Sequence, residues 1–127
     1  MKNEGTFSGN WNDGQTNIIV NLPMISFEED GSQILYCPAL DISGYGNSEK
    51  EAFESFQIAL SEFLLYTTHK NTLEKELISL GWSVKKKHRK MIPPSMQKLL
   101  VNNDNFGRIF NNFPFRKFDQ PVTLPAA

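Results

Sequence analysis

The sequence predicts an α+β fold in which a small sheet is backed by one long helix, followed by a C-terminal extension that is helical, rich in phenylalanine and ends in a short strand. Three observations favour this fold. An apolar, β-branched run occupies residues 18–27, two shorter segments with apolar alternation follow before residue 46, and a long helical pattern starts at Ser48. The expected element order for residues 17–90 is therefore βββα(α)β.

The composition is typical of a globular chain with one core. The 127 residues are 39% hydrophobic and 12% aromatic, and the net charge of −1 gives no whole-molecule field that would attract nucleic acid or an anionic membrane. Cys37 is the single cysteine, which excludes an intramolecular disulfide and argues against a thiolate zinc site. No apolar signal core opens the chain, and no apolar run approaches the roughly 18 residues of a membrane span. We therefore expect a cytoplasmic protein with no membrane partner.

The N-terminal part of the chain is expected to be a flexible arm followed by the first strand. Glycines and asparagines surround Phe7 and Trp11 within residues 1–16 without helical or strand periodicity. The first strand is expected over residues 18–27. Pro23 lies inside it, and because proline donates no ladder hydrogen bond, we expect an edge, a bulge or a change of partner at that point.

Two short strands and a tight turn are expected next. Asp30-Gly31 tolerates the positive φ angles of a hairpin turn. Alternating side chains in residues 32–37 predict a second strand, which ends before Pro38. A third strand is expected over residues 42–45.

The clearest helix in the sequence starts at Ser48, where Ser48-Glu49-Lys50-Glu51 is a capping box. Its apolar residues fall on one broad face that is expected to pack on the sheet. Ile58 and Leu65 lie a heptad apart on the opposite side. They are candidates for a partner or subunit contact, and the alternative is that the C-terminal part of the same chain covers them.

The remaining residues are expected to add one more strand and a C-terminal extension over residues 91–127. Residues 72–80 predict a short helix, and residues 82–85 predict the fourth strand of the sheet. Further helical spacing follows Pro93-Pro94-Ser95, and residues 121–125 predict an extended piece at a sheet edge. The extension is expected to dock on the same domain, residues 17–90, or on a second subunit. Its candidate contact residues are Phe113, Phe115 and Phe118.

Three segments of the sequence show a family resemblance. They are Asp30-Gly31, Tyr36-Cys37-Pro38-Ala39-Leu40 and Gly44-Tyr45-Gly46-Asn47-Ser48-Glu49-Lys50-Glu51-Ala52. In these segments the sequence resembles the HicB family of antitoxins over residues 17–86. The resemblance implies a partial ribonuclease-H-like fold and binding to a small HicA-like toxin that cuts mRNA. Residues 91–127 match neither of the DNA-binding modules, helix-turn-helix or ribbon-helix-helix, in which many members of the family end.

No motif for catalysis or for a cofactor is present. A ribonuclease-H-type nuclease needs several carboxylates on neighbouring strands to hold two metal ions, and residues 18–27 contain none. His69 and His88 have no partner in a catalytic motif, and Cys37 lies in an apolar setting typical of an inert thiol. We therefore expect a protein that is not an enzyme, with no catalytic residue, metal or cofactor.

The one strong charge cluster is a candidate for phosphate contacts. It consists of Lys85, Lys86, Lys87, Arg89 and Lys90. The alternative is a solvated connector between two structural elements. Three function hypotheses follow from the sequence: a HicB-like antitoxin, a homo-oligomeric structural or regulatory protein that uses the same fold without a toxin, and a DNA-binding autorepressor.

Overall fold

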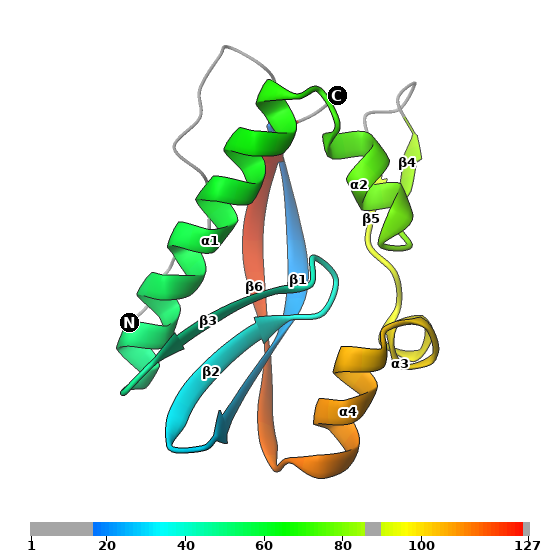
Figure 1. Cartoon of the computed structure of the whole chain (residues 1–127). Coiled ribbons are helices and arrows are strands. Elements are labelled where there is room, and N and C mark those ends of the chain that lie inside the picture. Colours follow the sequence, from blue (N-terminus) through cyan, green and yellow to red (C-terminus); the bar gives the residue numbers. More distant parts are fainter. Residues whose placement is uncertain (1–16, 86–89, 126–127) are drawn as a thin grey trace.

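The structure is a computed structural model, and it describes residues 17–85 and 90–125 (Figure 1). The predicted arm, residues 1–16, lies outside the described residues. The described strands are β1 (Asn17–Glu29), β2 (Ser32–Cys37), β3 (Ile42–Gly46), β4 (Ser83–Lys85), β5 (Lys90–Ile92) and β6 (Phe115–Pro125). The described helices are α1 (Glu49–His69), α2 (Leu73–Ser79), α3 (Met96–Asn102) and α4 (Asp104–Asn112). None of these helices is both long and apolar enough to span a bilayer.

The main sheet is antiparallel and has the strand order β3-β2-β1-β6. The predicted hairpin is confirmed, since β1 pairs with β2 from Ile25↔Tyr36 to Glu29↔Ser32. Asp30 and Gly31 form its turn with φ angles of 53° and 81°, a backbone conformation that glycine adopts without strain and that aspartate tolerates. The α+β class and the first three strands are thus as the sequence predicts.

The fourth strand of this sheet is not the one predicted. Residues 83–85 form β4, which pairs with β5 in a separate two-stranded sheet. The fourth place belongs to β6, which pairs with β1 along its whole length, from Asn17↔Pro125 to Phe27↔Phe115. The reason is the apolar surface that each strand can bury: β4 has three residues, none of which is fully buried, whereas the eleven residues of β6 include the fully buried Val122 and Leu124.

The strand edge predicted at Pro23 is confirmed. β1 has β6 on one side from residue 17 onwards, but it gains β2 on the other side only at Ile25. At Pro23 one side of β1 therefore has no neighbouring strand. A proline can be placed there because no ladder hydrogen bond is required on that side. The C-terminal strand also lies at a sheet edge, as expected, although it starts at Phe115 rather than at residue 121.

Helix α1 covers one face of the sheet and begins with the predicted cap. The Ser48 hydroxyl accepts a hydrogen bond from the Glu51 amide at 3.1 Å, and the Glu51 carboxylate accepts one from the Asn47 amide at 2.8 Å. The buried side of α1 consists of Ala52, Phe56, Leu60, Leu64 and Thr67. The helix approaches β3 so closely that a Cβ atom at Gly44 would overlap backbone atoms of Ala52 and Phe56.

The C-terminal extension covers the opposite face of the sheet (Figure 1). Register places Ile25 and Phe27 on the face that points away from α1. Phe106 and Ile109 of α4 are buried in the same core, and the ring of Phe113 lies 5.2 Å from that of Phe27. The sheet is therefore enclosed between α1 and α4, and the extension docks on the chain that carries it.

The close packing of α1 on β3 predicts the effect of Gly44→Ala. The new methyl group would lie 2.7 Å from the Phe56 Cα, and backbone atoms cannot move aside as a flexible side chain can. We expect a loss of about 3 kcal/mol in the free energy of unfolding, measured by urea denaturation. Gly107→Ala in α4 is the matched control, because its nearest contact is the Leu100 carbonyl oxygen at 3.7 Å. It should be neutral or stabilise by up to about 1 kcal/mol.

Docking of the extension predicts a contrast between two phenylalanines of α4. Phe106 is fully buried, whereas Phe110 is 43% exposed. Phe106→Ala should lower the free energy of unfolding by about 3 to 5 kcal/mol. Phe110→Ala should cost much less, since a smaller part of its ring leaves water on folding. Equal losses in the two variants, measured by urea denaturation, would contradict the docking of α4.

Candidate binding surfaces

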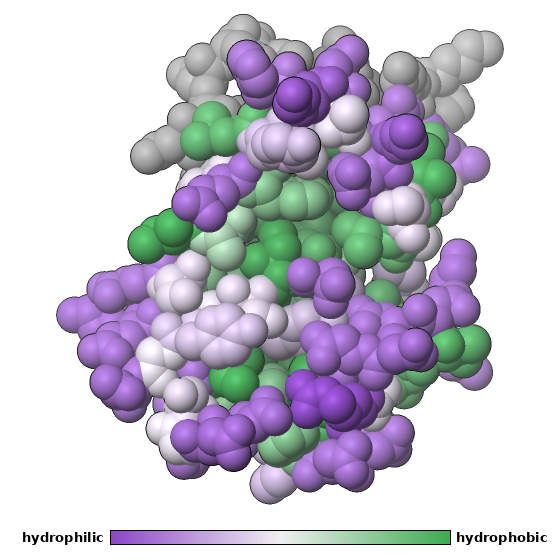
Figure 2. Space-filling view, viewed as in Figure 1, coloured by the Kyte–Doolittle hydropathy of each residue, from purple (hydrophilic) through white to green (hydrophobic). Residues whose placement is uncertain are grey.

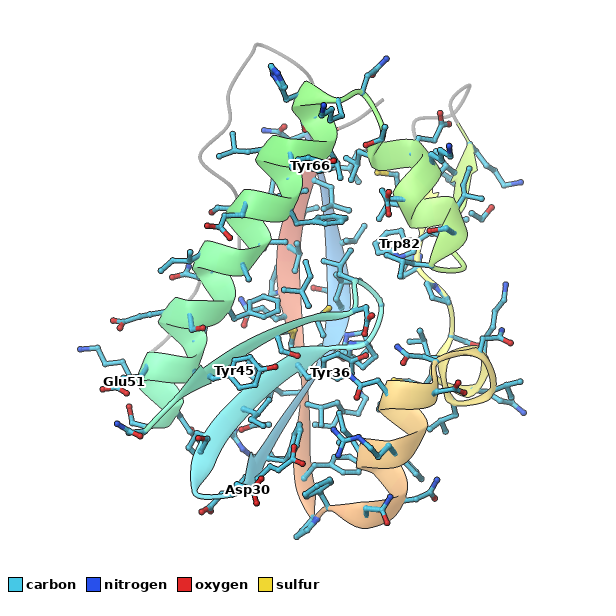
Figure 3. The ribbon with its side chains drawn as sticks, viewed as in Figure 1. Asp30, Tyr36, Tyr45, Glu51, Tyr66 and Trp82 are labelled. Carbon is cyan, nitrogen blue, oxygen red and sulfur yellow. The ribbon has the colours of Figure 1, made fainter. Side chains whose placement is uncertain are left out.

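Of the predicted contact residues, the two on the outward face of α1 are the most exposed. Ile58 is 61% exposed and Leu65 is 43% exposed, and the neighbouring Tyr66 is 63% exposed. Figure 3 shows Glu51 and Tyr66 near the two ends of this helix, and in Figure 2 apolar surface interrupts the hydrophilic outer edge of α1. The alternative that the C-terminal part of the chain covers Ile58 and Leu65 is therefore wrong, because both side chains are exposed.

The three predicted contact phenylalanines have partners inside the chain instead. Phe113 packs on Phe27, and the rings of Phe115 and Phe110 lie 5.5 Å apart. Phe118 is partly buried against the core, with the guanidinium of Arg116 5.3 Å from its ring. These rings belong to β6 and to the segment before it, so the structure does not bring them together with Ile58 and Leu65 in one surface.

The structure describes two residues of the basic cluster, Lys85 at the end of β4 and Lys90 at the start of β5. Lys85 and Lys90 are both exposed and stand opposite each other in the register. Lys86, Lys87 and Arg89 lie outside the described residues. Like charges directly opposite in an antiparallel pair repel each other. The Lys85–Lys90 pair therefore does not stabilise the hairpin of β4 and β5. Contact of the basic cluster with phosphate stays a prediction.

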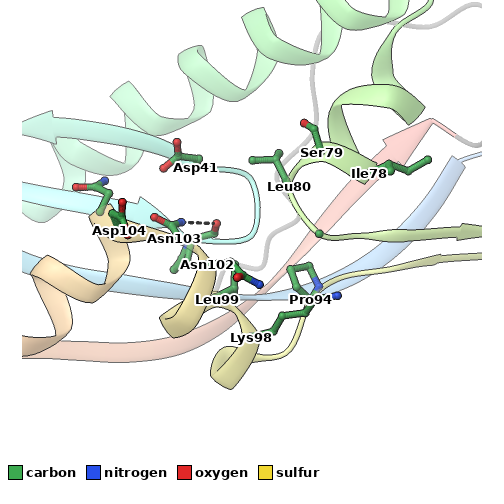
Figure 4. Close-up of a pocket in the computed structure, with 13 residues that line it drawn as sticks. Asp41, Ile78, Ser79, Leu80, Pro94, Lys98, Leu99, Asn102, Asn103 and Asp104 are labelled. Atoms are coloured by element: carbon green, nitrogen blue, oxygen red, sulfur yellow. Dashed lines mark hydrogen bonds between the residues drawn. The ribbon is translucent and has the colours of Figure 1, made fainter.

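A pocket of about 480 Å³ lies where three distant segments meet (Figure 4). The β2–β3 turn contributes Pro38 and Asp41, the end of α2 contributes residues 78–81, and the third wall comes from residues 94–105. Sequence reasoning missed this pocket, because its walls are far apart in the chain. Its lining combines an apolar floor with carboxylates, amides and one lysine, so it can accommodate a ligand with both polar and apolar parts.

One wall of this pocket is fixed by a hydrogen-bond network around Tyr36. The Tyr36 hydroxyl donates to the Asp41 carboxylate at 2.6 Å and accepts from the Asn103 side-chain amide at 2.9 Å. Asn103 also donates to the Pro38 carbonyl and caps α4 by accepting from the Phe106 amide. Burial, followed by the hydrogen bond to Asp41, raises the pKa of Tyr36 far above its ordinary value.

Across residues 17–85 and 90–125, no three His, Cys, Asp or Glu side chains lie together where they could hold a metal ion. Cys37 is fully buried at the end of β2, and burial raises the pKa of its thiol to about 12. A buried thiol with such a pKa is almost entirely protonated at neutral pH.

Comparison with known proteins gives no relative: no protein-family model matches the sequence, and neither the curated proteins nor the solved structures contain a significant match.

The buried thiol predicts how stability depends on alkaline pH. The folded state holds the Cys37 proton up to about pH 12, whereas the unfolded chain releases it near its ordinary pKa of 9.0. The unfolded state therefore binds fewer protons above pH 9, and the stability contribution that is complete below that pH is lost as the pH rises. The free energy of unfolding should fall with a slope approaching about 1.4 kcal/mol per pH unit, and Tyr36 should add to the slope above pH 10.

Cys37→Ala should remove the slope between pH 9 and 10 in urea denaturation measured at each pH. Ala39→Gly is the control, because it removes a buried methyl group from the adjacent β2–β3 turn without changing an ionisable group. An unchanged slope in Cys37→Ala would show that the thiol is not the titrating group.

Proposed function

We propose that the protein is a HicB-like antitoxin, a binding protein that acts in the cytoplasm and neutralises a small mRNA-cleaving toxin of the HicA kind. The observation that carries this proposal is that the residues of the resemblance build one structural unit. Asp30-Gly31 forms the hairpin turn, Gly44 allows the close approach of α1, and Ser48 with Glu51 caps that helix. The unit corresponds to the βββα part of the βββαβ arrangement that the resemblance implies, and β6 takes the place of the last strand in the sheet.

The side chains of this unit favour binding over catalysis. Its buried polar atoms serve the fold: Tyr36 bonds to Asp41, and the Trp82 indole donates to the Ala39 carbonyl at 2.8 Å. Its outer surface, in contrast, carries large apolar side chains that are more than half exposed, among them Ile58 and Tyr66. Neighbouring exposed apolar side chains that are rimmed by polar residues mark surfaces that bind another protein.

Neutralisation by binding needs no chemistry from the antitoxin. A toxin that cleaves mRNA must present basic side chains to the RNA phosphates. A protein that covers this basic surface competes with RNA for it, so occupancy alone prevents cleavage.

A homo-oligomer without a toxin is a second candidate function, and the exposure of Ile58 and Leu65 favours it. Light scattering of the purified full chain separates the two candidates. A stable dimer that binds no small protein would support the homo-oligomer.

The antitoxin proposal is tested by purifying the full chain from its native cells and identifying the small protein that accompanies it by mass spectrometry. Expressed alone, that protein should arrest growth and degrade mRNA, and co-expression with the chain should restore growth. Gly44→Ala should weaken the rescue because it disturbs the β3–α1 packing, whereas Gly107→Ala should leave it intact. A stoichiometric partner that leaves mRNA intact, or the absence of any stoichiometric partner, would contradict the proposal.

A further inference from the structure

We propose that the outward face of α1 is a docking surface for a basic protein surface. The inference deepens the proposed function by naming the surface and its chemistry, and it rests on that function only for the identity of the partner.

The docking surface is a continuous stripe along one side of the helix. Its members follow a spacing of three or four residues, which places them on one face. Each of them is exposed in the structure, so the stripe faces solvent. The stripe consists of Glu51, Glu54, Ile58, Glu62, Leu65 and Tyr66.

The stripe has the composition of an interface that selects a partner by charge. Ile58 and Leu65 supply apolar area in its middle part, with Glu62 between them and with Glu51 and Glu54 toward the start of the helix. The three glutamates carry three negative charges. No lysine or arginine lies on the stripe itself. Lys50 and Lys70 are on its flanks, and Lys70 extends over the Tyr66 ring at 6.0 Å from its centroid. The complementary surface is therefore basic with an apolar centre.

The inner face of α1 leaves this stripe free to bind. Phe56, Leu60 and Leu64 are fully buried against the sheet and hold the helix in place, so docking requires no rearrangement of the fold. The 21 residues of α1 span about 30 Å, which is long enough to contribute most of one side of a standard interface.

A second copy of the chain fits the stripe poorly. If two α1 helices packed antiparallel with Ile58 against Leu65 of the other copy, the two Glu62 side chains would meet near the centre. If they packed parallel, Glu54 and Glu62 would each face the same residue of the other copy. Both arrangements bring carboxylates together at the middle of an apolar contact, where desolvation makes their repulsion costly.

The experiment places a photocrosslinker in the stripe of the full chain. The variant Ile58→p-benzoylphenylalanine is expressed in the native cells and irradiated, and the adduct is identified by mass spectrometry. Val101→p-benzoylphenylalanine is the matched control, since Val101 is 75% exposed on α3 and lies outside the stripe. We expect position 58, and not position 101, to crosslink to one small protein whose sequence is strongly basic.

The charge of the stripe is tested with the partner identified in this way. The double variant Glu54→Lys/Glu62→Lys should weaken binding by about tenfold or more, measured by calorimetry at low salt, and should reduce the salt dependence of binding. Glu28→Lys is the control, because it reverses an exposed charge in the β1–β2 hairpin. Both charge variants should keep the circular dichroism and melting temperature of the native chain within a few degrees.

Four outcomes would overturn the inference: no adduct at position 58, an adduct with a second copy of this chain, an adduct with an acidic or neutral partner, or unchanged affinity in the double variant. The same experiments distinguish failure of the docking surface from failure of the proposed function. A basic partner that does not cleave mRNA leaves the docking surface intact and refutes the antitoxin. A toxin that the chain neutralises without contacting position 58 supports the antitoxin and refutes the docking surface.

Discussion

The pairing of β6 with β1 is the constraint on which the rest of the structure depends. Eleven registered pairs, from Asn17↔Pro125 to Phe27↔Phe115, join the two ends of the described chain. Because β6 follows α4 directly, this ladder also determines where the C-terminal helices lie and holds them on the face of the sheet that α1 does not cover. Without it, the apolar side chains on that face, including Ile25 and Phe27, would remain in contact with water.

The same docking builds the pocket and tightens the β2–β3 turn. Asn103, at the junction of α3 and α4, reaches back to the Tyr36 hydroxyl and to the Pro38 carbonyl. Trp82 adds a second long-range bond to the same turn through Ala39. These bonds satisfy polar groups that would otherwise be buried without partners, and such groups are costly to leave unpaired. The turn therefore depends on two segments that follow it by more than forty residues.

Helix α1 separates the requirements of folding from those of binding. Its inner face packs closely on β3 at Gly44. The amide of Tyr45 in β3 donates a hydrogen bond to the Ser55 hydroxyl at 3.1 Å. This bond also satisfies one backbone donor at the edge of the sheet. The outer face of α1 takes no part in the described core. Substitutions at Glu54, Ile58, Glu62 and Leu65 should therefore change partner binding with little effect on stability, and substitutions on the inner face should do the opposite. Glu51 serves both purposes, because its carboxylate also caps the helix.

The sequence by itself determined the elements whose causes are local: the Asp30-Gly31 turn, the capping box at Ser48, the amphipathic period of α1 and the edge at Pro23. Each depends on side chains within a few residues of one another, so spacing is sufficient to predict it. Only the tertiary structure decided which strand completes the sheet, where Phe113, Phe115 and Phe118 pack, and that Ile58 and Leu65 remain exposed. These outcomes depend on which distant segments bury the most apolar surface together, a competition between β4 and β6 for one edge of β1 that local patterns do not encode.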